Sequence, residues 1–470
     1  MNNIYYKKKI KNINIKMQEM KDESGVPFTK GPDTGSEKGS EKGSFLRGNG
    51  LLILILIAVV IILIIILIII LVSKSGGDEE SGNENENKEE AQDQETSKIY
   101  VIGKYDVTST SKSTKLYGQY SSPPFYKDYS TLISSVWIDG KKTQVDSDGS
   151  FQFKRTGTYT VKIYFKEDLK YIDALFQFCS ELTEVDFSNI DTSQVTQMGS
   201  LFKGCYNLQE ITFGNKFKTN NVVRMSDLFS SCSSLSDIDI SEFDTSNVEN
   251  MDSMFEGCTN LKRITFGSIK TSKVTSMRRL FKNCNSLRDI DLSKFDTTKV
   301  TNFESMFGGC SSLETIDTEY LDTSSGLDLS GMFEECKELI SLDLSDFETD
   351  KAFDMSYMFQ GSTELKSINL ESFNTKKVLE MEFMFTDCKS LKSLDLSSFN
   401  TPKLTNMNNM FAGCSSLSNI DISNFDTSNI EEPLDIFTGL PSTGKLTYNS
   451  DKFSSDIVNT LPLGWTKTES

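Results

Sequence analysis

The sequence predicts an α/β repeat solenoid of the leucine-rich-repeat type, in which short strands form a parallel sheet and short helices connect them. Three observations predict it: a pattern that recurs every 26 residues with one step of 27, cysteines that all occupy one place in that pattern, and a short apolar motif, LxxIxL, in each repeat. Units this short pack on their neighbours, so chain length sets the number of repeats. The cysteines are Cys179, Cys205, Cys232, Cys258, Cys284, Cys310, Cys336, Cys388 and Cys414, and Ser362 takes the one missing place.

The first part of the chain carries the signals of a membrane anchor. Residues 1–50 contain ten Lys or Arg among many Gly and Ser, which predicts a disordered cytoplasmic tail. The next 22 residues, 51–72, are apolar and uncharged. At a rise of about 1.5 Å per residue, a helix of this length crosses the core of a bilayer. We therefore expect an uncleaved transmembrane signal-anchor and a single-pass type II protein of the cell membrane, with its N-terminus cytoplasmic and its repeats extracellular.

Two segments connect the expected membrane helix to the repeats. Residues 73–97 are rich in Asp, Glu, Asn and Gly, a composition that predicts an extended acidic stalk outside the cell. Residues 98–167 alternate apolar and polar positions and carry Asp-Gly turn signals at 139–140 and 148–149, so we expect a small antiparallel β module. This module is either an N-terminal cap on the first edge of the solenoid or a separate ligand-binding domain, and we favour the cap.

Residues 168–440 are predicted to form ten repeats, and residues 441–470 a C-terminal cap. Within LxxIxL, the second and third apolar residues, such as Ile238 and Ile240, are expected on the inward side of a short strand. After a polar turn, apolar residues recur at spacings typical of one face of a short helix. In one repeat these helical residues are Val248, Met251, Met254, Phe255 and Cys258, and in the next they are Val274, Met277, Leu280, Phe281 and Cys284.

A threonine occupies the same place in each of the ten repeats. We expect its hydroxyl to satisfy backbone groups that would otherwise be left unpaired where the chain leaves the strand. These residues are Thr192, Thr219, Thr245, Thr271, Thr297, Thr323, Thr349, Thr375, Thr401 and Thr427.

The stretch LSNIDISNFDTSNI at 417–430 resembles the repeat of the BspA-like leucine-rich-repeat surface proteins, LxxIDLSxFDTSxVxxMxxMFxGC. The resemblance covers roughly residues 130–467 and includes a lead-in and a closing segment. It implies a solenoid scaffold and a place among proteins associated with attachment of microbes to host cells, matrix proteins or other cells. One departure is that Phe243, Phe295, Phe373 and Phe399 stand where general leucine-rich repeats carry Asn, so the usual asparagine ladder is not expected.

The composition argues against catalysis and against nucleic-acid binding. The chain contains no His, the commonest general base and metal ligand. Stacked repeats place the cysteines in a row rather than around one point, so we expect buried free thiols instead of a metal site or disulfides. The net charge of −18 disfavours contact with phosphate backbones. We therefore expect no enzymatic activity, no cofactor and no nucleic-acid partner.

One outward column of the predicted strands is acidic, and it is the candidate partner-binding site. Two interpretations stand: the carboxylates bond to nearby hydroxyls and backbone, or they bind cations or a basic partner. The function we expect is adhesion to, or recognition of, proteins or glycans on other cells or matrix. The alternative is a structural surface-coat or spacer protein without a dedicated ligand. The acidic column consists of Asp186, Asp239, Asp291, Asp317, Asp343, Asp395 and Asp421.

Overall fold

The structure of the protein is a computed structural model that describes residues 97–118, 128–430 and 433–470. The predicted cytoplasmic tail, the predicted signal-anchor at 51–72 and nearly all of the predicted stalk at 73–97 lie outside the described residues. Among the residues that are described, no helix is both long and apolar enough to cross a membrane.

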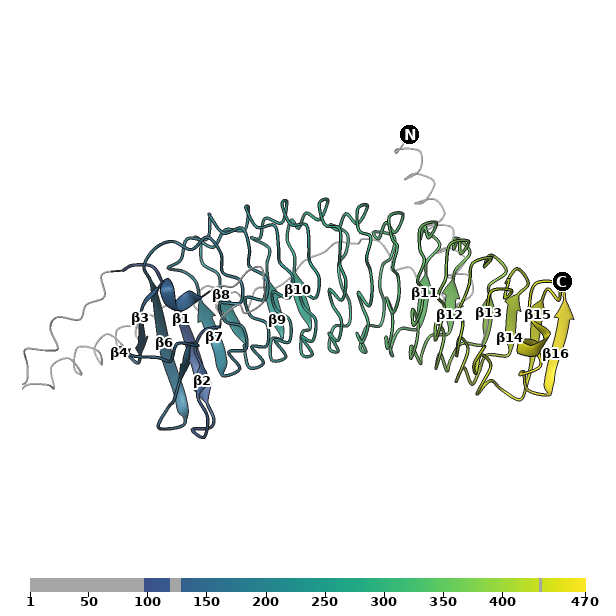
Figure 1. The fold of residues 1–470 in the computed structure, drawn as a ribbon, viewed down its shortest axis with the longest axis horizontal. Helices are drawn as coiled ribbons and strands as arrows, with labels where there is room; N and C mark the ends of the chain where they lie inside the picture. Colours follow the sequence, from purple (N-terminus) through teal and green to yellow (C-terminus); the bar gives the residue numbers. More distant parts are fainter. Residues whose placement is uncertain (1–96, 119–127, 431–432) are drawn as a thin grey trace, which may run out of the picture. The chain divides into compact units, whose positions relative to one another are not determined.

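The described residues belong to one compact unit, Glu90–Ser470, and most of that unit is a β-solenoid of about ten turns (Figure 1). Successive turns are stacked in register, so that Ile238 pairs with Ile264 and Leu394 with Ile420 in parallel strands. The strands of the turns are β7 (Leu182–Asp186), β8 (Glu210–Thr212), β9 (Asp237–Asp239), β10 (Arg263–Thr265), β11 (Ser341–Asp343), β12 (Ser367–Asn369), β13 (Ser393–Asp395) and β14 (Asn419–Ile422).

The parallel sheet is divided into segments rather than continuous. β7 pairs with β8, β9 with β10, β11 with β12, and β13 with β14, while residues 289–291 and 315–317 are not strands. In the second of these gaps Thr318 takes the inward place that an apolar residue holds in most other turns. Its buried hydroxyl donates a hydrogen bond of 2.6 Å to the carbonyl of Asp343. A polar inward residue therefore accompanies one local loss of strand pairing.

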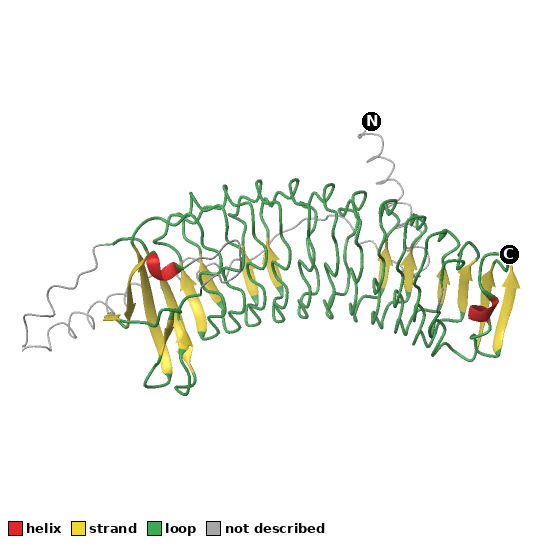
Figure 2. Ribbon diagram, in the orientation of Figure 1, coloured by secondary structure: helices red, strands yellow, loops and turns green. Residues whose placement is uncertain are grey.

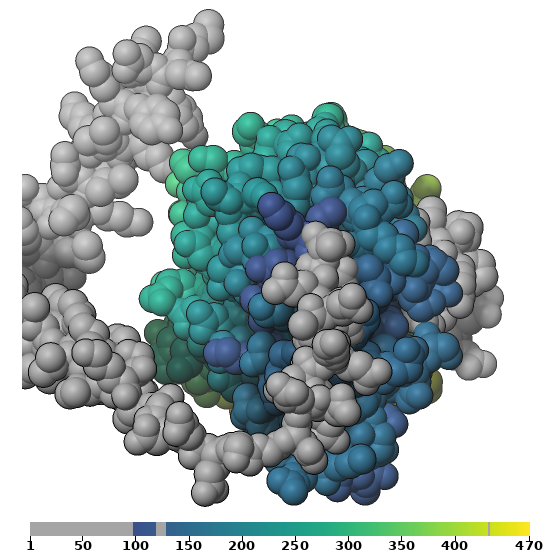
Figure 3. Space-filling model, turned by 90° about the vertical axis from the view of Figure 1, so that its left-hand side faces the viewer, coloured from purple at the N-terminus to yellow at the C-terminus, as the bar shows by residue number. Residues whose placement is uncertain are grey.

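Antiparallel strands precede the solenoid and join its sheet. β1 pairs with β6 on one side and with β7 on the other, which gives the strand order β4-β3-β6-β1-β7-β8. Asp139 and Gly140 have φ angles of 46° and 78° in the hairpin between β3 and β4. Viewed from this end, the residues of these strands lie in front of the first turns (Figure 3). The elements are β1 (Tyr100–Val107), β2 (Thr114–Lys115), η1 (Tyr129–Thr131), β3 (Ile133–Ile138), β4 (Lys141–Thr143), β5 (Ser150–Phe151) and β6 (Gly157–Phe165).

The C-terminal residues extend the last segment of the sheet. β15 (Thr443–Tyr448) pairs in parallel with β14, and β16 (Gly464–Glu469) pairs in parallel with β15. The short helix α3 (Ser455–Val458) lies between them in the chain and buries Ile457 and Val458. The indole of Trp465 donates a hydrogen bond of 2.8 Å to the carbonyl of Pro441.

The prediction of short helices in the repeats is wrong. Among the described residues, the only helices are η1 and α3, and the segments expected to be helical consist of turns (Figure 2). In 248–258, alternate N–H groups donate to the next turn of the solenoid, as from Ser253 to the carbonyl of Arg278 at 2.8 Å. The N–H groups between them donate to the carbonyl three residues earlier in the chain, as from Glu256 to the carbonyl of Ser253 at 3.1 Å, and so close tight turns. Side chains three or four residues apart therefore point inward without an α-helix.

Left-handed backbone conformations explain why these segments cannot be helical. Each turn contains two residues with positive φ, four residues apart, such as Ser253 at 55° and Gly257 at 76°. From 204 to 413 the second of these positions alternates between a glycine and a residue with a side chain, and the pattern runs Gly204, Ser231, Gly257, Asn283, Gly309, Glu335, Gly361, Asp387 and Gly413; the next turn breaks the alternation with a second glycine, Gly439. A Cβ at Gly309 would lie 2.2 Å from Oδ1 of Asn283, and one at Gly361 would lie 2.4 Å from Oε1 of Glu335. These two glycines thus make room for the side chain of the preceding turn.

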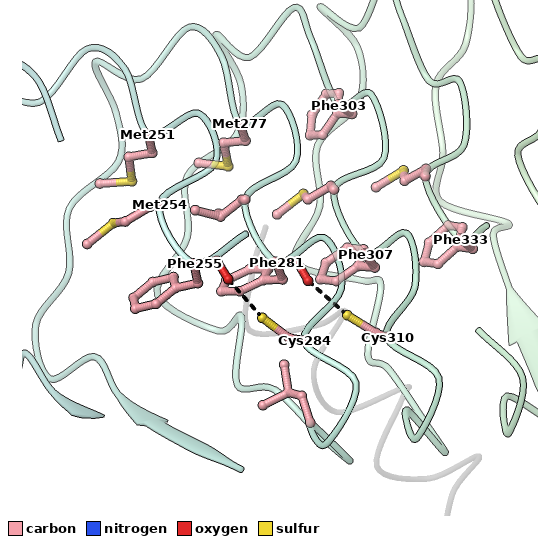
Figure 4. Packing of buried hydrophobic residues seen from close by; sticks show 14 of the residues in the cluster. Met251, Met254, Phe255, Met277, Phe281, Cys284, Phe303, Phe307, Cys310 and Phe333 are labelled. Carbon is pink, nitrogen blue, oxygen red and sulfur yellow. Dashed lines mark hydrogen bonds between the residues drawn. The ribbon is translucent and has the colours of Figure 1, made fainter. Parts of the chain in front are cut away.

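The core is a set of identical side chains stacked along the solenoid (Figure 4). The Phe rings of successive turns, such as Phe255, Phe281 and Phe307, lie with centroids 5.4 to 6.1 Å apart and planes 2° to 18° from parallel. The cysteines are buried and free, which confirms the prediction of free thiols. Cys284 donates a hydrogen bond of 3.2 Å to the carbonyl of Phe255 in the preceding turn, and Ser362 makes the equivalent bond to Phe333.

The threonine column hydrogen-bonds one turn to the next, as expected for hydroxyls that satisfy backbone groups. Thr271 donates to the carbonyl of Asp296 at 2.8 Å and accepts from the N–H of the same residue at 2.7 Å. The equivalent donated bonds extend from Thr192 to Thr427, and all ten threonines are buried.

Candidate functional site

The predicted acidic column lies on the outer side of the strand positions. Parallel pairing places Asp395 directly beside Asp421, and Asp343 beside Asn369. Asp186 and Asp421 are half-buried, and the other five carboxylates of the column are exposed. The structure therefore brings these residues into one row along the solenoid, at the strand spacing of about 4.8 Å where neighbouring strands pair.

Each carboxylate of the column closes a local turn. One oxygen of each Asp accepts a hydrogen bond from the N–H of the residue two positions later, as Asp395 does from Ser397 at 3.0 Å. Asn369 accepts the equivalent bond from Glu371 at 3.2 Å. An amide thus performs the structural role as well as a carboxylate does.

Hydrogen bonding also affects the protonation of this column. In Asp239, Asp291 and Asp395, bonds from the hydroxyl and the N–H of the serine two residues later hold the carboxyl pKa below its usual value. Burial opposes this effect only weakly at such exposed positions. These three carboxylates therefore keep their charge further into acid than an ordinary Asp does.

The same turn occurs in two other columns. Asp191, Asp244 and Asp296 accept from the N–H two residues later, next to the threonine column. Asp328 and Asp354 do the same in a third column, where Asn250, Asn302 and Asn406 occupy equivalent places. The acidic column is thus one of three sets of turn-closing side chains, and the turns account for its regular repetition.

The surface around the acidic column changes along the solenoid. Near its start, ion pairs link neighbouring turns: Lys104 with Glu184, Arg263 with Asp237, and Arg288 with Glu314 at 2.9 Å. Hollows of about 300 and 320 Å³ lie at Asp186 and Asp291. In the later turns the neighbouring outward column is Ser341, Ser367 and Ser393. The N-terminal half of this surface is therefore densely charged, and the later half carries serines beside the acidic column.

A second surface, which sequence analysis did not single out, follows the predicted helical segments. Its backbone is joined from turn to turn by single parallel bridges between Gln197, Arg224, Asn250, Ser276, Asn302, Asp328, Asp354, Glu380 and Asn406. We call the surface formed by these residues and their immediate neighbours the bridge face.

The earlier part of the bridge face contains a hollow of about 640 Å³ with paired charges. Lys203 forms an ion pair with Asp227 at 2.8 Å, and Arg279 forms one with Glu304 at 2.9 Å. Asp252 accepts a hydrogen bond from the N–H of Arg278 at 3.0 Å, and Arg224 donates to the hydroxyl of Ser226 at 2.7 Å. Most charges here have protein partners, as on an ordinary ion-paired surface.

The later part of the bridge face contains an acidic hollow of about 470 Å³. Its lining includes five carboxylates and no Lys or Arg: Glu304, Glu334, Asp354, Glu380 and Glu382. Arg278 and Arg279 pair with Glu304, and Lys282 pairs with Glu334. In the described part of the chain, no basic side chain forms an ion pair with Asp354, Glu380 or Glu382.

Two pKa shifts in this hollow arise first from burial and then from its negative charges. Burial, and then the neighbouring charges of Asp328 and Glu382, raise the pKa of Asp354 above its usual value. The Tyr357 hydroxyl donates a hydrogen bond of 2.9 Å to Glu382, and burial together with this bond raises the pKa of Tyr357 to about 12. A cation near these groups would be stabilised by the same negative charges.

The described residues contain no cluster of side chains suited to a metal ion. Across 97–118, 128–430 and 433–470, no three His, Cys, Asp or Glu side chains form a group that could hold a metal ion. Burial raises the pKa of the thiols, to about 12 for Cys258 and Cys310, so these cysteines are neutral at physiological pH.

The comparison with protein-family models identifies the repeats. The model described as "Mycoplasma protein of unknown function, DUF285" matches residues 170–266, 257–368 and 327–450, which together make up more than half of the chain. The chain belongs to this family. Its description assigns no activity to members of the family. No curated protein matches the chain.

Three solved structures are similar to the chain at low identity. A chain of the Toll–Spatzle complex, described as a molecular hub in Drosophila development and innate immunity, is 17% identical over 59% of this chain, with a TM-score of 0.19. A leucine-rich repeat protein of T. pallidum is 17% identical over 61% of this chain and 86% of its own, with a TM-score of 0.16. The functional domain of InlJ from Listeria monocytogenes, which includes a cysteine ladder, is 15% identical over 57% of this chain and 69% of its own, with a TM-score of 0.12.

The matched region spans 41% of that chain of the Toll–Spatzle complex. Because all three TM-scores are below 0.5, the solenoid architecture of this family member rests on its own strand register and hydrogen bonds.

Proposed function

We propose that the protein is a non-enzymatic recognition protein of the cell surface, which binds proteins or glycans of other cells or of matrix through its solenoid. The observation that carries this proposal is the division of each turn into uniform inward positions and varied outward ones. Phe, Met, Cys and Thr repeat inside, whereas the residues paired along the bridge face change from Arg224 to Asn250 to Asp354. Such a scaffold offers a long surface whose side chains vary without disturbing the core.

The proposed membrane attachment rests on sequence alone. The apolar residues 51–72 and the basic residues before them support a type II orientation with the repeats outside the cell. The resemblance to BspA-like surface proteins supports the same placement. Protease added to intact cells is expected to remove the repeats and to spare the N-terminal tail, and protection of the repeats would contradict this orientation.

We also propose that the strands in 98–167 act as a cap. The pairing of β1 along the outer edge of β7 supports this role, because it occupies hydrogen-bonding groups that would otherwise form an open sheet edge. By the same reasoning, β15 and β16 cover the edge of β14.

The recognition function can be tested with purified full-length chain applied to intact cells, matrix proteins and glycans. The matched variant changes all seven residues of the acidic column from Asp to Asn. Because Asn369 already closes the same turn, these substitutions remove charge and keep the fold. Retention of the wild-type chain on at least one of these surfaces is expected. Absence of retention on all of them would contradict a recognition function, and equal retention of the variant would exclude the acidic column as its site.

A further inference from the structure

An exposed apolar row runs along the bridge face beside the acidic hollow. Leu327, Phe353 and Leu379 occupy equivalent places in three consecutive turns and remain 40%, 41% and 39% exposed. The N–H of Phe353 donates to the carbonyl of Leu327, and the N–H of Leu379 donates to the carbonyl of Phe353, each at 2.9 Å. The three side chains are therefore immediate neighbours on the surface and form a continuous ridge, which we call the apolar row.

The apolar row is not required by the solenoid. The same place in other turns is held by Thr196, Thr275, Thr301 and Thr405, which are exposed, by Glu249, and by one isolated apolar residue, Val223. Thr405 donates a hydrogen bond of 3.0 Å to the carbonyl of Leu379, so a hydroxyl fits the turn well. Burial in the fold does not explain three consecutive large apolar side chains here, whereas contact with a partner does.

Charges on the two sides of the apolar row differ in exposure. On one side, Asp328, Asp354 and Glu380 directly follow the three apolar residues in the chain, are joined by parallel bridges and are half-buried. On the other side, Lys351 and Lys377 precede Phe353 and Leu379 by two residues and are exposed. A partner that covers the row would remove water from the half-buried carboxylates first. Without a basic partner, that desolvation would be costly.

From the apolar row and the charges beside it we infer that this part of the bridge face docks a protein segment that is both apolar and basic. Apolar side chains of the segment would cover Leu327, Phe353 and Leu379, and its Lys or Arg would pair with Asp354, Glu380 and Glu382 in the hollow. This inference rests on the proposed recognition function and names the chemistry of one partner. Neutral or acidic glycans fit less well, because they offer no cation to these carboxylates.

The test measures binding of synthetic peptides to full-length chain by fluorescence anisotropy. One peptide alternates Lys with Leu, a second alternates Glu with Leu, and a third alternates Lys with Ser. The Lys–Leu peptide is expected to bind at least about tenfold more tightly than either of the others, since both chemistries are required. Its affinity should fall as ionic strength rises. Comparable binding of all three peptides would overturn the proposal, and so would binding of dextran without binding of the Lys–Leu peptide.

Two variants and one matched control locate the site. The first variant combines Leu327→Thr, Phe353→Thr and Leu379→Thr, residues that the same column already carries elsewhere. The second combines Asp354→Asn, Glu380→Gln and Glu382→Gln. The control is Val223→Thr, which removes a side chain of the same column that is 39% exposed and lies outside the apolar row.

Each of the two variants is expected to weaken Lys–Leu peptide binding by about tenfold or more, and the control is expected to bind like wild type. A cooperative thermal unfolding transition with a Tm no lower than that of the wild-type chain would show that the variants are folded. Equal loss in Val223→Thr, or no loss in either variant, would overturn the assignment. If the wild-type chain still binds cells or matrix but not the peptide, this docking site is wrong and the recognition function stands. If the wild-type chain binds neither the peptide nor cells and matrix, the docking site and the recognition function are both wrong.

Discussion

At the scale of single residues, short polar side chains hold successive turns together. Buried threonine hydroxyls bond to the backbone of the next turn, and Asp or Asn side chains close the turns of three separate columns. These bonds satisfy backbone groups that have no helix or continuous sheet to pair with. The sequence predicted the role of the threonines, because an unbroken polar column in a buried pattern needs a hydrogen-bonding explanation.

Thr271→Val tests this role. Valine keeps the shape of threonine but leaves both the N–H and the carbonyl of Asp296 without the Thr271 hydroxyl. The free energy of unfolding should fall by about 1–3 kcal/mol, the cost of leaving buried polar groups unsatisfied. Denaturant unfolding measures this change. Thr271→Ser keeps the hydroxyl and should lose less stability; a larger loss for serine would show that the methyl group matters more than the hydrogen bonds.

Asp354→Asn tests the negative field of the acidic hollow. The folded-state pKa of Asp354 is raised, so the charged carboxylate destabilises the fold above that pKa, and the penalty disappears as pH falls below the unfolded pKa of about 3.9. Asparagine can still accept from Ser356, as Asn302 does from Glu304. The variant should therefore have a higher Tm than wild type at pH 7 and the same Tm at pH 3. An equal Tm difference at both pH values would contradict an electrostatic cause.

At the scale of elements, the sequence predicted the inward columns and most of the strands, but neither the loss of strands at 289–291 and 315–317 nor the connecting turns. The buried residues Val248, Met251, Met254, Phe255 and Cys258 have helical spacing, yet tight turns closed three residues back give the same spacing. Hydrophobic periodicity cannot distinguish the two arrangements. A sharper signal was present in the glycines at 204, 257, 309, 361 and 413, which recur in every second repeat and mark a left-handed position that a regular helix does not contain.

Gly309→Ala tests the packing of these turns. The added Cβ would meet Asn283 and would also occupy a left-handed conformation, so stability should fall by about 2–4 kcal/mol. Gly140→Ala isolates the effect of the left-handed conformation, because the φ of Gly140 is also positive and no atom lies within 4 Å of the added Cβ. This substitution should lower the free energy of unfolding by about 1 kcal/mol. Adding Asn283→Gly to Gly309→Ala should recover part of the loss in thermal unfolding. No recovery would show that the two residues do not compete for space.

At the scale of the whole molecule, each turn contacts mainly its neighbours, and the core extends along the solenoid instead of forming one globular cluster. Parallel pairing sets Asp395 of the acidic column beside Asp421, but the turn-closing role of the column depends on backbone geometry that composition does not reveal. The bridge face was not singled out, because its residues share no type. The 26-residue period places Leu327, Phe353 and Leu379 in equivalent positions of neighbouring turns, but only the structure shows that their side chains are exposed.

The reactivity of the free thiols can show how the core of the solenoid unfolds. All nine are buried, and burial raises their pKa, so the native chain should react with Ellman's reagent far more slowly than the unfolded chain does. Titration in guanidinium chloride should then reveal nine reactive thiols. If the thiols become reactive in separate steps as denaturant rises, the turns open in groups. Fast reaction in native buffer would contradict the burial of the cysteines.

The alternation of glycine and larger residues has a consequence for how such a chain can change its length. Loss of a single 26-residue repeat, for example the one that carries Gly309, would bring Asn283 against Glu335, two side chains competing for a space that holds one. Loss of two repeats would restore the match. Loss of a repeat that carries the larger residue would instead leave two glycines in consecutive turns, as Gly413 and Gly439 already are. Related chains should therefore lose single repeats with the larger residue more readily than single repeats with the glycine.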